Sequence, residues 1–114
     1  MTAGVKRIRR GDLVTVALTG HYGKPRPALV IQSDLFQEHP SVTILPVTSE
    51  LRRTPIFRIA IQPTPENGLQ KPSQVMVDKT HTIPREKVGK PFGRLEDDTM
   101  LAVNRALAVF LGFA

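Results

Sequence analysis

The stretch that decides the fold covers residues 20–34 and reads GHYGKPRPALVIQSD, a basic loop that leads directly into a short apolar strand. Pro25 and Pro27 keep the chain extended on both sides of Arg26, and residues 28–31 predict a buried strand. Arg26 therefore leaves a stiff stem, and its planar guanidinium suits phosphate oxygens. From this stretch alone, a solvated surface charge is the commoner outcome for such an arginine.

The composition describes one globular domain. A chain of 114 residues with 40% hydrophobic content is large enough for a single core. We predict a flexible basic arm over residues 1–9 and one domain over residues 10–114. No stretch is long enough to span a bilayer, so we expect a soluble protein without a membrane partner.

Charge and cysteine content limit the function classes. The chain has no cysteine, which excludes disulfides, thiolate metal sites and a cysteine nucleophile, and fits the reducing cytoplasm. Sixteen Lys and Arg against ten Asp and Glu give a net charge of +6, which favours polyanionic partners such as nucleic acid or an acidic protein segment.

Strands dominate the predicted elements. Alternation and β-branched residues predict strands over residues 12–18, 28–31, 41–47, 55–61 and 73–78, with single helical turns near residues 33–40 and 84–88. Pro46 lacks an N–H and suggests that its strand ends at an edge of the sheet.

Residues 96–113 form the one long helix candidate. Acids at positions 96–98 suit a helix N-terminus, and the first apolar stripe contains Met100, Val103, Leu107 and Phe110. The far half is apolar nearly all round, which requires more than one packing surface. We therefore predict a mainly β, mostly antiparallel barrel with a packed C-terminal helix, assembled as a two-fold homodimer that covers this helix and the edge strands.

A series of motifs now points to a known family. The tripeptide RGD at 10–12, the run GKPRPALVIQ at 23–32, LPVTS at 45–49, VMVD at 75–78, Thr82-Ile83 and the helical tail match in order and spacing. Together they resemble the MazF/PemK family of ribosome-independent endoribonuclease toxins. The resemblance implies an SH3-like plasmid-addiction toxin fold, a homodimer, cleavage of single-stranded RNA at short sequences, and an antitoxin whose acidic, disordered tail covers the RNA groove.

The resemblance also implies the site residues. The family's loop arginine falls on Arg26 and its strand-end threonine on Thr48, with Ser49 beside it. His21 and Asp78 fall on a loop histidine and a strand aspartate of the PemK branch. This chain departs from that branch at positions 76, 79 and 81, where it has Met, Lys and His.

RNA can be cut without a protein nucleophile when the neighbouring 2′-hydroxyl attacks phosphorus, which gives a 2′,3′-cyclic phosphate. Arg26 suits the donor role, and Thr48 and Ser49 either donate to a phosphate oxygen or merely cap a turn. His21 is the candidate for proton transfer, with simple solvation as the alternative. Asp78 either orients a base or binds a nucleobase edge, unless it is an ordinary turn residue.

Other basic and aromatic residues are candidate RNA contacts. The basic candidates are Lys24, Arg52, Arg53, Arg58 and Lys79, while Phe57 fits base stacking and core packing equally well. The ten acids are scattered and the three histidines show no ligand spacing, so we expect neither a metal nor another cofactor.

Two other function classes remain open from the residues alone. A CcdB-like gyrase poison would share the architecture, but it relies on a tryptophan near its C-terminus, and this chain has no tryptophan. A non-catalytic SH3-like nucleic-acid-binding module would explain the charge but not the pairing of Arg26 with Thr48.

Overall fold

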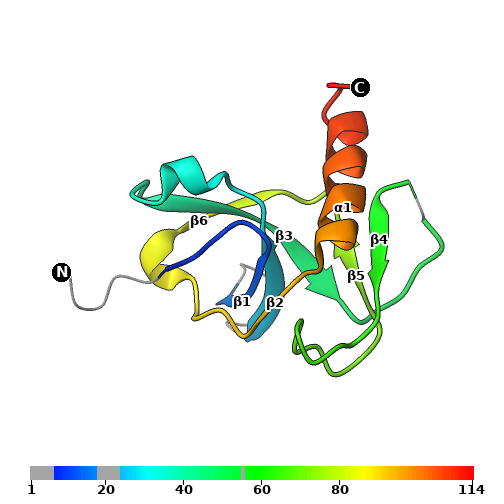
Figure 1. Cartoon of the computed structure of the whole chain (residues 1–114), viewed down its shortest axis with the longest axis horizontal. Helices are drawn as coiled ribbons and strands as arrows, with labels where there is room; N and C mark the ends of the chain where they lie inside the picture. Colours follow the sequence, from blue (N-terminus) through cyan, green and yellow to red (C-terminus); the bar gives the residue numbers. More distant parts are fainter. Residues whose placement is uncertain (1–6, 18–23, 55) are drawn as a thin grey trace.

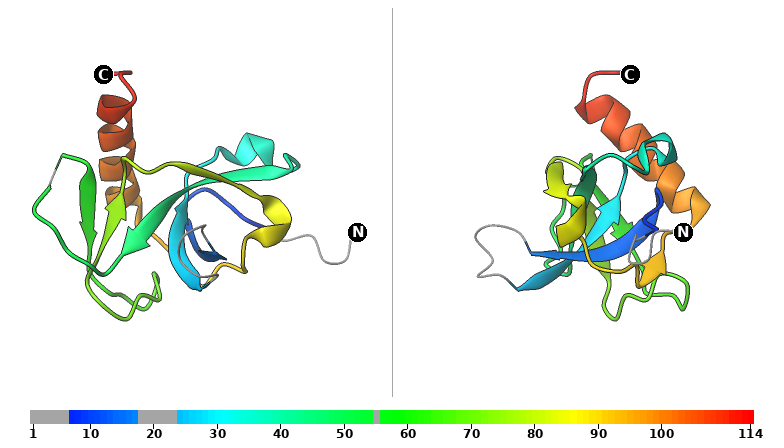
Figure 2. Two further views of the ribbon diagram at one scale, coloured as in Figure 1. Left: turned by 180° about the vertical axis from the view of Figure 1, so that it is seen from behind. Right: turned by 90° about the vertical axis from the view of Figure 1, so that its left-hand side faces the viewer.

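The computed structural model describes residues 7–17, 24–54 and 56–114, which form a curled sheet with a helix beside it (Figures 1 and 2). In chain order the elements are β1 (Asp12–Ala17), β2 (Pro25–Val30), a 3-10 turn η1 (Asp34–Phe36), β3 (Ser41–Thr48), β4 (Arg58–Ile61), β5 (Ser73–Met76), β6 (His81–Pro84), a second 3-10 turn η2 (Arg85–Lys87), β7 (Gly93–Arg94) and α1 (Asp97–Phe110).

The sheet confirms the predicted fold class. Its strands follow the order β4-β5-β3-β2-β1-β7, with β6 paired to the other half of β3, and every pairing is antiparallel. The eight-residue β3 is the longest strand and pairs with β2, β5 and β6. It therefore holds the two halves of the curled sheet together.

Both faces of the central strands are buried, which explains why β2 reads as a continuous apolar run rather than an alternating one. Leu29 of β2 faces the first hydrophobic cluster, together with Leu13, Leu45 and the helix residue Val103. Ala28 and Val30 point the other way into the second cluster, with Val14, Val16, Val42, Ile44 and Val88. Successive β2 side chains thus serve two cores.

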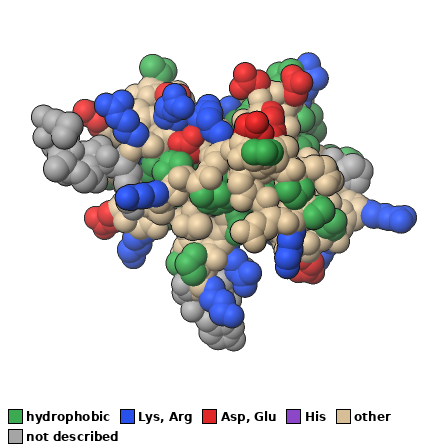
Figure 3. All heavy atoms as spheres, turned by 60° about the horizontal axis from the view of Figure 1, so that its bottom comes forward, with side chains coloured by type: hydrophobic (Ala, Val, Ile, Leu, Met, Phe, Trp, Pro, Cys, Tyr) green, Lys and Arg blue, Asp and Glu red, His purple; other side chains and the backbone are tan. Residues whose placement is uncertain are grey.

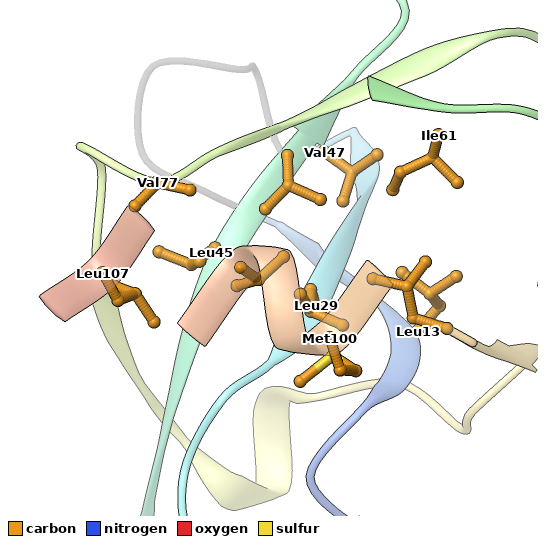
Figure 4. Close-up of a cluster of buried hydrophobic side chains, with 11 residues drawn as sticks. Leu13, Leu29, Leu45, Val47, Ile61, Val77, Met100 and Leu107 are labelled. Carbon is orange, nitrogen blue, oxygen red and sulfur yellow. The ribbon is translucent and has the colours of Figure 1, made fainter. Parts of the chain in front are cut away.

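The helix closes the first cluster. Met100, Val103 and Leu107 face the leucines of the strands, as Figure 4 shows for Met100 and Leu107. The helix ends at Phe110 rather than at residue 113 as predicted, because Gly112 adopts φ +84° and the N–H of Phe113 bonds back to the Ala108 carbonyl at 2.7 Å. This is the glycine C-cap pattern of a Schellman motif.

Pro46 does not mark an edge, so that prediction was wrong. Pro46 pairs with Ala28 on one side, within an inner strand. On its other side, residues 41–44 of β3 pair with β6 and residues 47 and 48 pair with β5. Pro46 lies in the gap where the ladder changes partner, and its missing N–H is not needed there.

The structure adds two strands that the sequence pattern did not indicate. β6 has four residues and is mostly exposed, and β7 has two. Such short segments carry no alternation to recognise. Within the described residues, α1 is too short and too polar to pass through a bilayer, and no other helix qualifies.

The RGD tripeptide fastens the start of the domain. Asp12 is 5% exposed and its carboxylate accepts from Arg94 at 2.7 Å and from the Arg9 N–H at 2.8 Å. Arg10 donates to the Ile31 carbonyl and to Asn104 of α1. Ile8, which lies in the predicted arm, is 2% exposed in the second cluster, so packing begins before residue 10.

Candidate active site

A groove of about 430 Å³ opens between the start of β2, the end of β3 and the loop of residues 62–72. Arg26 and Pro27 line it from β2, and Thr48, Ser49 and Glu50 line it from the end of β3. The structure therefore brings together the two residues that the sequence singled out most strongly, although 22 positions separate them in the chain.

The groove exists because β2 and β3 stop pairing at Ala28 and Pro46. The N–H of Ile31 donates to Thr43 at 3.1 Å, so residues 29 and 27 also direct their backbone groups toward β3. Pro27 has no N–H, and the next bond of the ladder would need one. The β2–β3 pairing ends at this point.

Strand β1 holds the backbone of Arg26, on the edge of β2 that lies away from β3. It pairs with Val16 of β1, and the β1–β2 ladder continues as far as Ala17 and Pro25. The backbone of Arg26 is therefore part of a sheet, while its exposed side chain lines the groove. If the β2–β3 register continued past Ala28 and Pro46, Arg26 would lie opposite Thr48.

Thr48 caps the turn that follows it and also lines the groove. Its hydroxyl oxygen accepts the Glu50 N–H at 3.0 Å, which is the turn-capping role. A hydroxyl also carries one hydrogen to donate, and Thr48 lines the groove beside Ser49. The turn bond therefore fixes the hydroxyl without using its donor.

The far wall of the groove was not predicted. Gly68, Leu69, Gln70 and Lys71 supply it from the loop that joins β4 to β5. In the sequence this loop shows only turn residues and a single basic side chain, and its distance along the chain from Arg26 gives no sign of contact.

Asn67 makes this wall rigid. It is fully buried, and its side-chain oxygen accepts the N–H groups of Thr64 and Leu69 at 3.0 Å each. Its amide donates to the Gln62 carbonyl at 2.8 Å. A buried side chain with every group bonded fixes the loop around it.

The remaining basic candidates lie around the turn after Thr48 or on the surface. Arg58 is part-buried and bonds to the Glu50 carbonyl and to Gln74, whereas Arg52 forms an exposed ion pair with Glu50 at 3.1 Å. Arg53 and Lys24 are exposed. Phe57 packs against the first hydrophobic cluster, which is the core role considered for it.

Asp78 and Lys79 lie outside the set of described residues that line the groove. They pair with each other at 3.7 Å, and the second carboxylate oxygen of Asp78 is buried without a hydrogen-bond partner among the described residues. His21 lies outside the described residues.

Basic side chains outnumber acidic ones among the described residues that line the groove. Arg26 and Lys71 line the groove, and among the described lining residues Glu50 is the single acid. Figure 3 shows Lys and Arg side chains projecting around the edge of one face of the molecule. Within the described part of the chain, no three His, Asp or Glu residues are grouped so that they could hold a metal ion.

Comparison with known proteins places this arrangement in a family. Residues 9–111 match the family model of PemK-like, MazF-like toxins of type II toxin–antitoxin systems. The chain belongs to this family. The SH3-like plasmid-addiction toxin fold expected from the sequence is therefore confirmed, and a gyrase poison or a bare nucleic-acid-binding module is not favoured.

Relatives of this MazF/PemK chain match over nearly its whole length. A Mycolicibacterium smegmatis protein described as a probable endoribonuclease MazF is 47% identical over 108 residues, which is 94% of this chain and 99% of the relative. The solved Mycobacterium tuberculosis toxin MazF-mt6 superposes with TM-score 0.75 at 26% identity, over 89% of this chain and 96% of that one. A mycobacterial endoribonuclease solved in complex with its cognate antitoxin shares the fold, with TM-score 0.79 at 24% identity over 95% and 98% of the two chains.

Gly68→Ala tests the rigidity of the groove wall. Gly68 has φ +67°, and an added Cβ would lie 2.8 Å from the Phe92 carbonyl oxygen. Gly112 is the matched control, because it has φ +84° with nothing within 4 Å of an added Cβ. We expect Gly112→Ala to lower the free energy of unfolding by about 1 kcal/mol through the strained backbone alone. Gly68→Ala should lower it by more, and urea unfolding measures both. Equal losses would show that the wall yields at this contact.

Proposed function

We propose that this MazF/PemK-family chain is a sequence-specific endoribonuclease toxin that cleaves single-stranded mRNA and so inhibits translation and growth. The observation that carries the proposal is the convergence of Arg26, Thr48 and Ser49 on one basic groove. The printed description of the Mycolicibacterium smegmatis relative, a probable endoribonuclease, supports it at 47% identity.

The groove supplies donors for a phosphate whose charge increases during the reaction. In the proposed step the 2′-oxygen of the ribose attacks the adjacent phosphorus and the bond to the 5′-oxygen breaks. The products are a 2′,3′-cyclic phosphate and a 5′-hydroxyl. Arg26 donates two parallel N–H groups to the phosphate oxygens, and the Thr48 hydroxyl donates a third hydrogen.

Proton transfer in this proposal uses groups on both sides of the scissile phosphate. The attacking hydroxyl loses a proton and the departing 5′-oxygen gains one. Arg26 lies in the groove and His21 remains the candidate from the sequence, with Asp78 as the residue that would orient a base. The proposal involves no metal, because the lining residues that the structure describes offer nitrogen and hydroxyl donors with a single carboxylate, Glu50.

RNA backbone contacts extend along both walls of the groove. We propose that Lys71 on the far wall binds a neighbouring phosphate and that Gln70 faces a nucleobase edge, because both line the groove opposite Arg26. Lys24, Arg52, Arg53 and Lys79 are exposed and would attract the RNA strand on either side.

Arg26→Ala tests the activity directly. We expect the cleavage rate of a long mixed-sequence RNA to fall by about 10²-fold or more, since one donor to the reacting phosphate is lost, while the melting temperature stays unchanged. Arg26→Lys should restore little, because Lys lacks the planar fork. Near-wild-type cleavage by folded Arg26→Ala would remove this residue from the site.

The same assay distinguishes the mechanism. An oligonucleotide with a single deoxyribose 5′ to the scissile phosphate should resist cleavage, and the unmodified RNA should be cut equally well in excess EDTA. Cutting of the deoxyribose substrate would exclude the 2′-hydroxyl as nucleophile, and loss of cutting in EDTA would require a metal.

We also propose a two-fold homodimer. The outer side of α1 and the chain after it carry large apolar side chains that are between 47% and 81% exposed in the single chain: Leu101, Val109, Phe110, Leu111 and Phe113. Phe110 was predicted to belong to the buried stripe, and it is 50% exposed in the single chain. An apolar surface of this kind is typical of a protein interface.

Val109→Asp tests the dimer. We expect the wild-type protein to sediment at twice 12.6 kDa at micromolar concentration, and Val109→Asp to sediment as a monomer because it places a charge in the interface. Leu35→Asp is the control, since Leu35 is 88% exposed at η1 and away from the helix. A monomeric wild-type protein would refute the dimer.

The partner that neutralises the toxin is proposed to be an acidic, partly disordered segment of a cognate antitoxin, lying across the basic face between Arg26 and Arg53. The family description places the chain in a toxin–antitoxin system. Such a segment would cover the groove and exclude RNA from it.

Salt dependence tests this surface. We expect purified cognate antitoxin to displace fluorescent, uncleavable RNA, and its affinity to fall as salt rises because exposed charges are screened. Arg53→Ala should weaken antitoxin binding, whereas Lys90→Ala should not, since Lys90 is also exposed but belongs to the segment between η2 and β7 and not to the turn after Thr48, which carries the groove residue Glu50. Binding that is indifferent to salt would place the antitoxin elsewhere.

A further inference from the structure

Side chains, rather than a neighbouring strand, hold the turn that follows Thr48. The last paired residue of β3 is Thr48, which lies opposite Gln74 of β5. After it, the Glu50 N–H is bound by the Thr48 hydroxyl at 3.0 Å and the Glu50 carbonyl by Arg58 at 2.9 Å. The backbone of Glu50 is therefore fixed from both sides.

Gln74 holds the next part of the turn. Its side-chain oxygen accepts the Arg52 N–H at 3.0 Å, and its amide donates to the Arg52 carbonyl at 2.9 Å. The same oxygen accepts from Arg58 Nη1 at 3.0 Å. Arg58 and Gln74 thus form one unit, here called the turn clamp, that binds Glu50 and Arg52.

The Nη1 group of Arg58 is committed to the protein. Nη1 carries two hydrogens, and these meet two acceptors, the Glu50 carbonyl and the Gln74 oxygen. Nη2 lies 3.5 Å from the sulfur of Met76. A phosphate bound across Nη1 and Nη2 would have to displace these acceptors.

We propose that Arg58 and Gln74 are positioning residues for RNA cleavage, which hold the Thr48 hydroxyl in its orientation toward the scissile phosphate. This inference rests on the proposed nuclease function. It also changes the role of Arg58, which the sequence placed among the RNA backbone contacts.

The turn clamp acts on the Thr48 hydroxyl through one residue, Glu50. The clamp fixes Glu50, the Glu50 N–H occupies a lone pair of the Thr48 oxygen, and the Thr48 hydrogen is then directed away from that bond. Without the clamp the Thr48 oxygen loses its fixed donor and the hydroxyl rotates among several orientations. A donor that must be ordered during the reaction stabilises the transition state less.

Gln74→Ala is the decisive variant because it breaks the clamp without changing any charge. Gln74 is also absent from the described residues that line the groove. Gln62→Ala is the matched control, since Gln62 is exposed and contributes to the fold through its backbone carbonyl. Arg58→Lys keeps the positive charge but does not reproduce the fork that reaches two acceptors.

The measurements separate positioning from binding. Single-turnover cleavage reports the chemical step, and the affinity for RNA with deoxyribose at the scissile position reports binding as a function of salt. We expect Arg58→Lys and Gln74→Ala each to slow single-turnover cleavage by about 10²-fold, with affinity changed less than about threefold and an unaltered salt slope. The double variant should be no slower than the worse single variant, because both remove one unit.

An RNA-contacting Arg58 would give a different pattern. Arg58→Ala would then reduce the salt slope by about 0.7, Arg58→Lys would retain most of the affinity, and Gln74→Ala would cleave like Gln62→Ala. Any of these results would overturn the positioning role. Near-wild-type cleavage by Gln74→Ala would do so by itself.

The clamp can be measured without any activity. Amide hydrogen exchange at Arg52 should accelerate in Gln74→Ala and stay slow in Gln62→Ala, while the melting curve confirms that both variants are folded. Faster exchange in a protein whose wild type cuts no RNA would show that the clamp exists and the nuclease proposal is wrong. Unchanged exchange would show that the clamp does not hold the turn, whatever the activity.

Discussion

The missing backbone N–H of Pro27 is the constraint on which the site depends. The β2–β3 ladder lacks that donor just past Ala28 and Pro46, where the pairing ends and the groove begins. On its other edge β2 stays paired with β1 as far as Pro25, so Arg26 is held firmly at the open end. At Arg26, β2 is paired with β1 along one edge and unpaired along the other. The arginine side chain is therefore exposed while its backbone stays part of the sheet.

The rest of the fold stabilises this opening from outside. β3 joins the two halves of the sheet. Its side chains pack into the first hydrophobic cluster on one face and into the second cluster on the other. Asp12 and Arg94 fasten β1 to β7 through a buried carboxylate, and Asn67 fixes the far wall. Because these polar groups are buried and bonded, the groove walls have few alternative conformations.

Some polar side chains of the site line the groove, and others hold the backbone around it. Arg26, Thr48 and Lys71 line the groove, whereas Arg58 is occupied by the turn after Thr48. Three basic residues that look alike in the sequence therefore have different surroundings. Their surroundings decide the task, since both hydrogens of Arg58 Nη1 are already bonded within the protein, whereas the side chains of Arg26 and Lys71 line the groove.

The sequence by itself determined the strands that bury both faces and the C-terminal helix, because alternation and apolar runs are local properties of the chain. Its resemblance to a family implied that Arg26 and Thr48 share one site. The sequence did not determine the inner position of Pro46, the strands β6 and β7, the wall around Lys71 or the bonds of Arg58. Only the tertiary structure decided these, since each depends on which distant backbone carbonyl, strand edge or side chain becomes a neighbour once the sheet has curled.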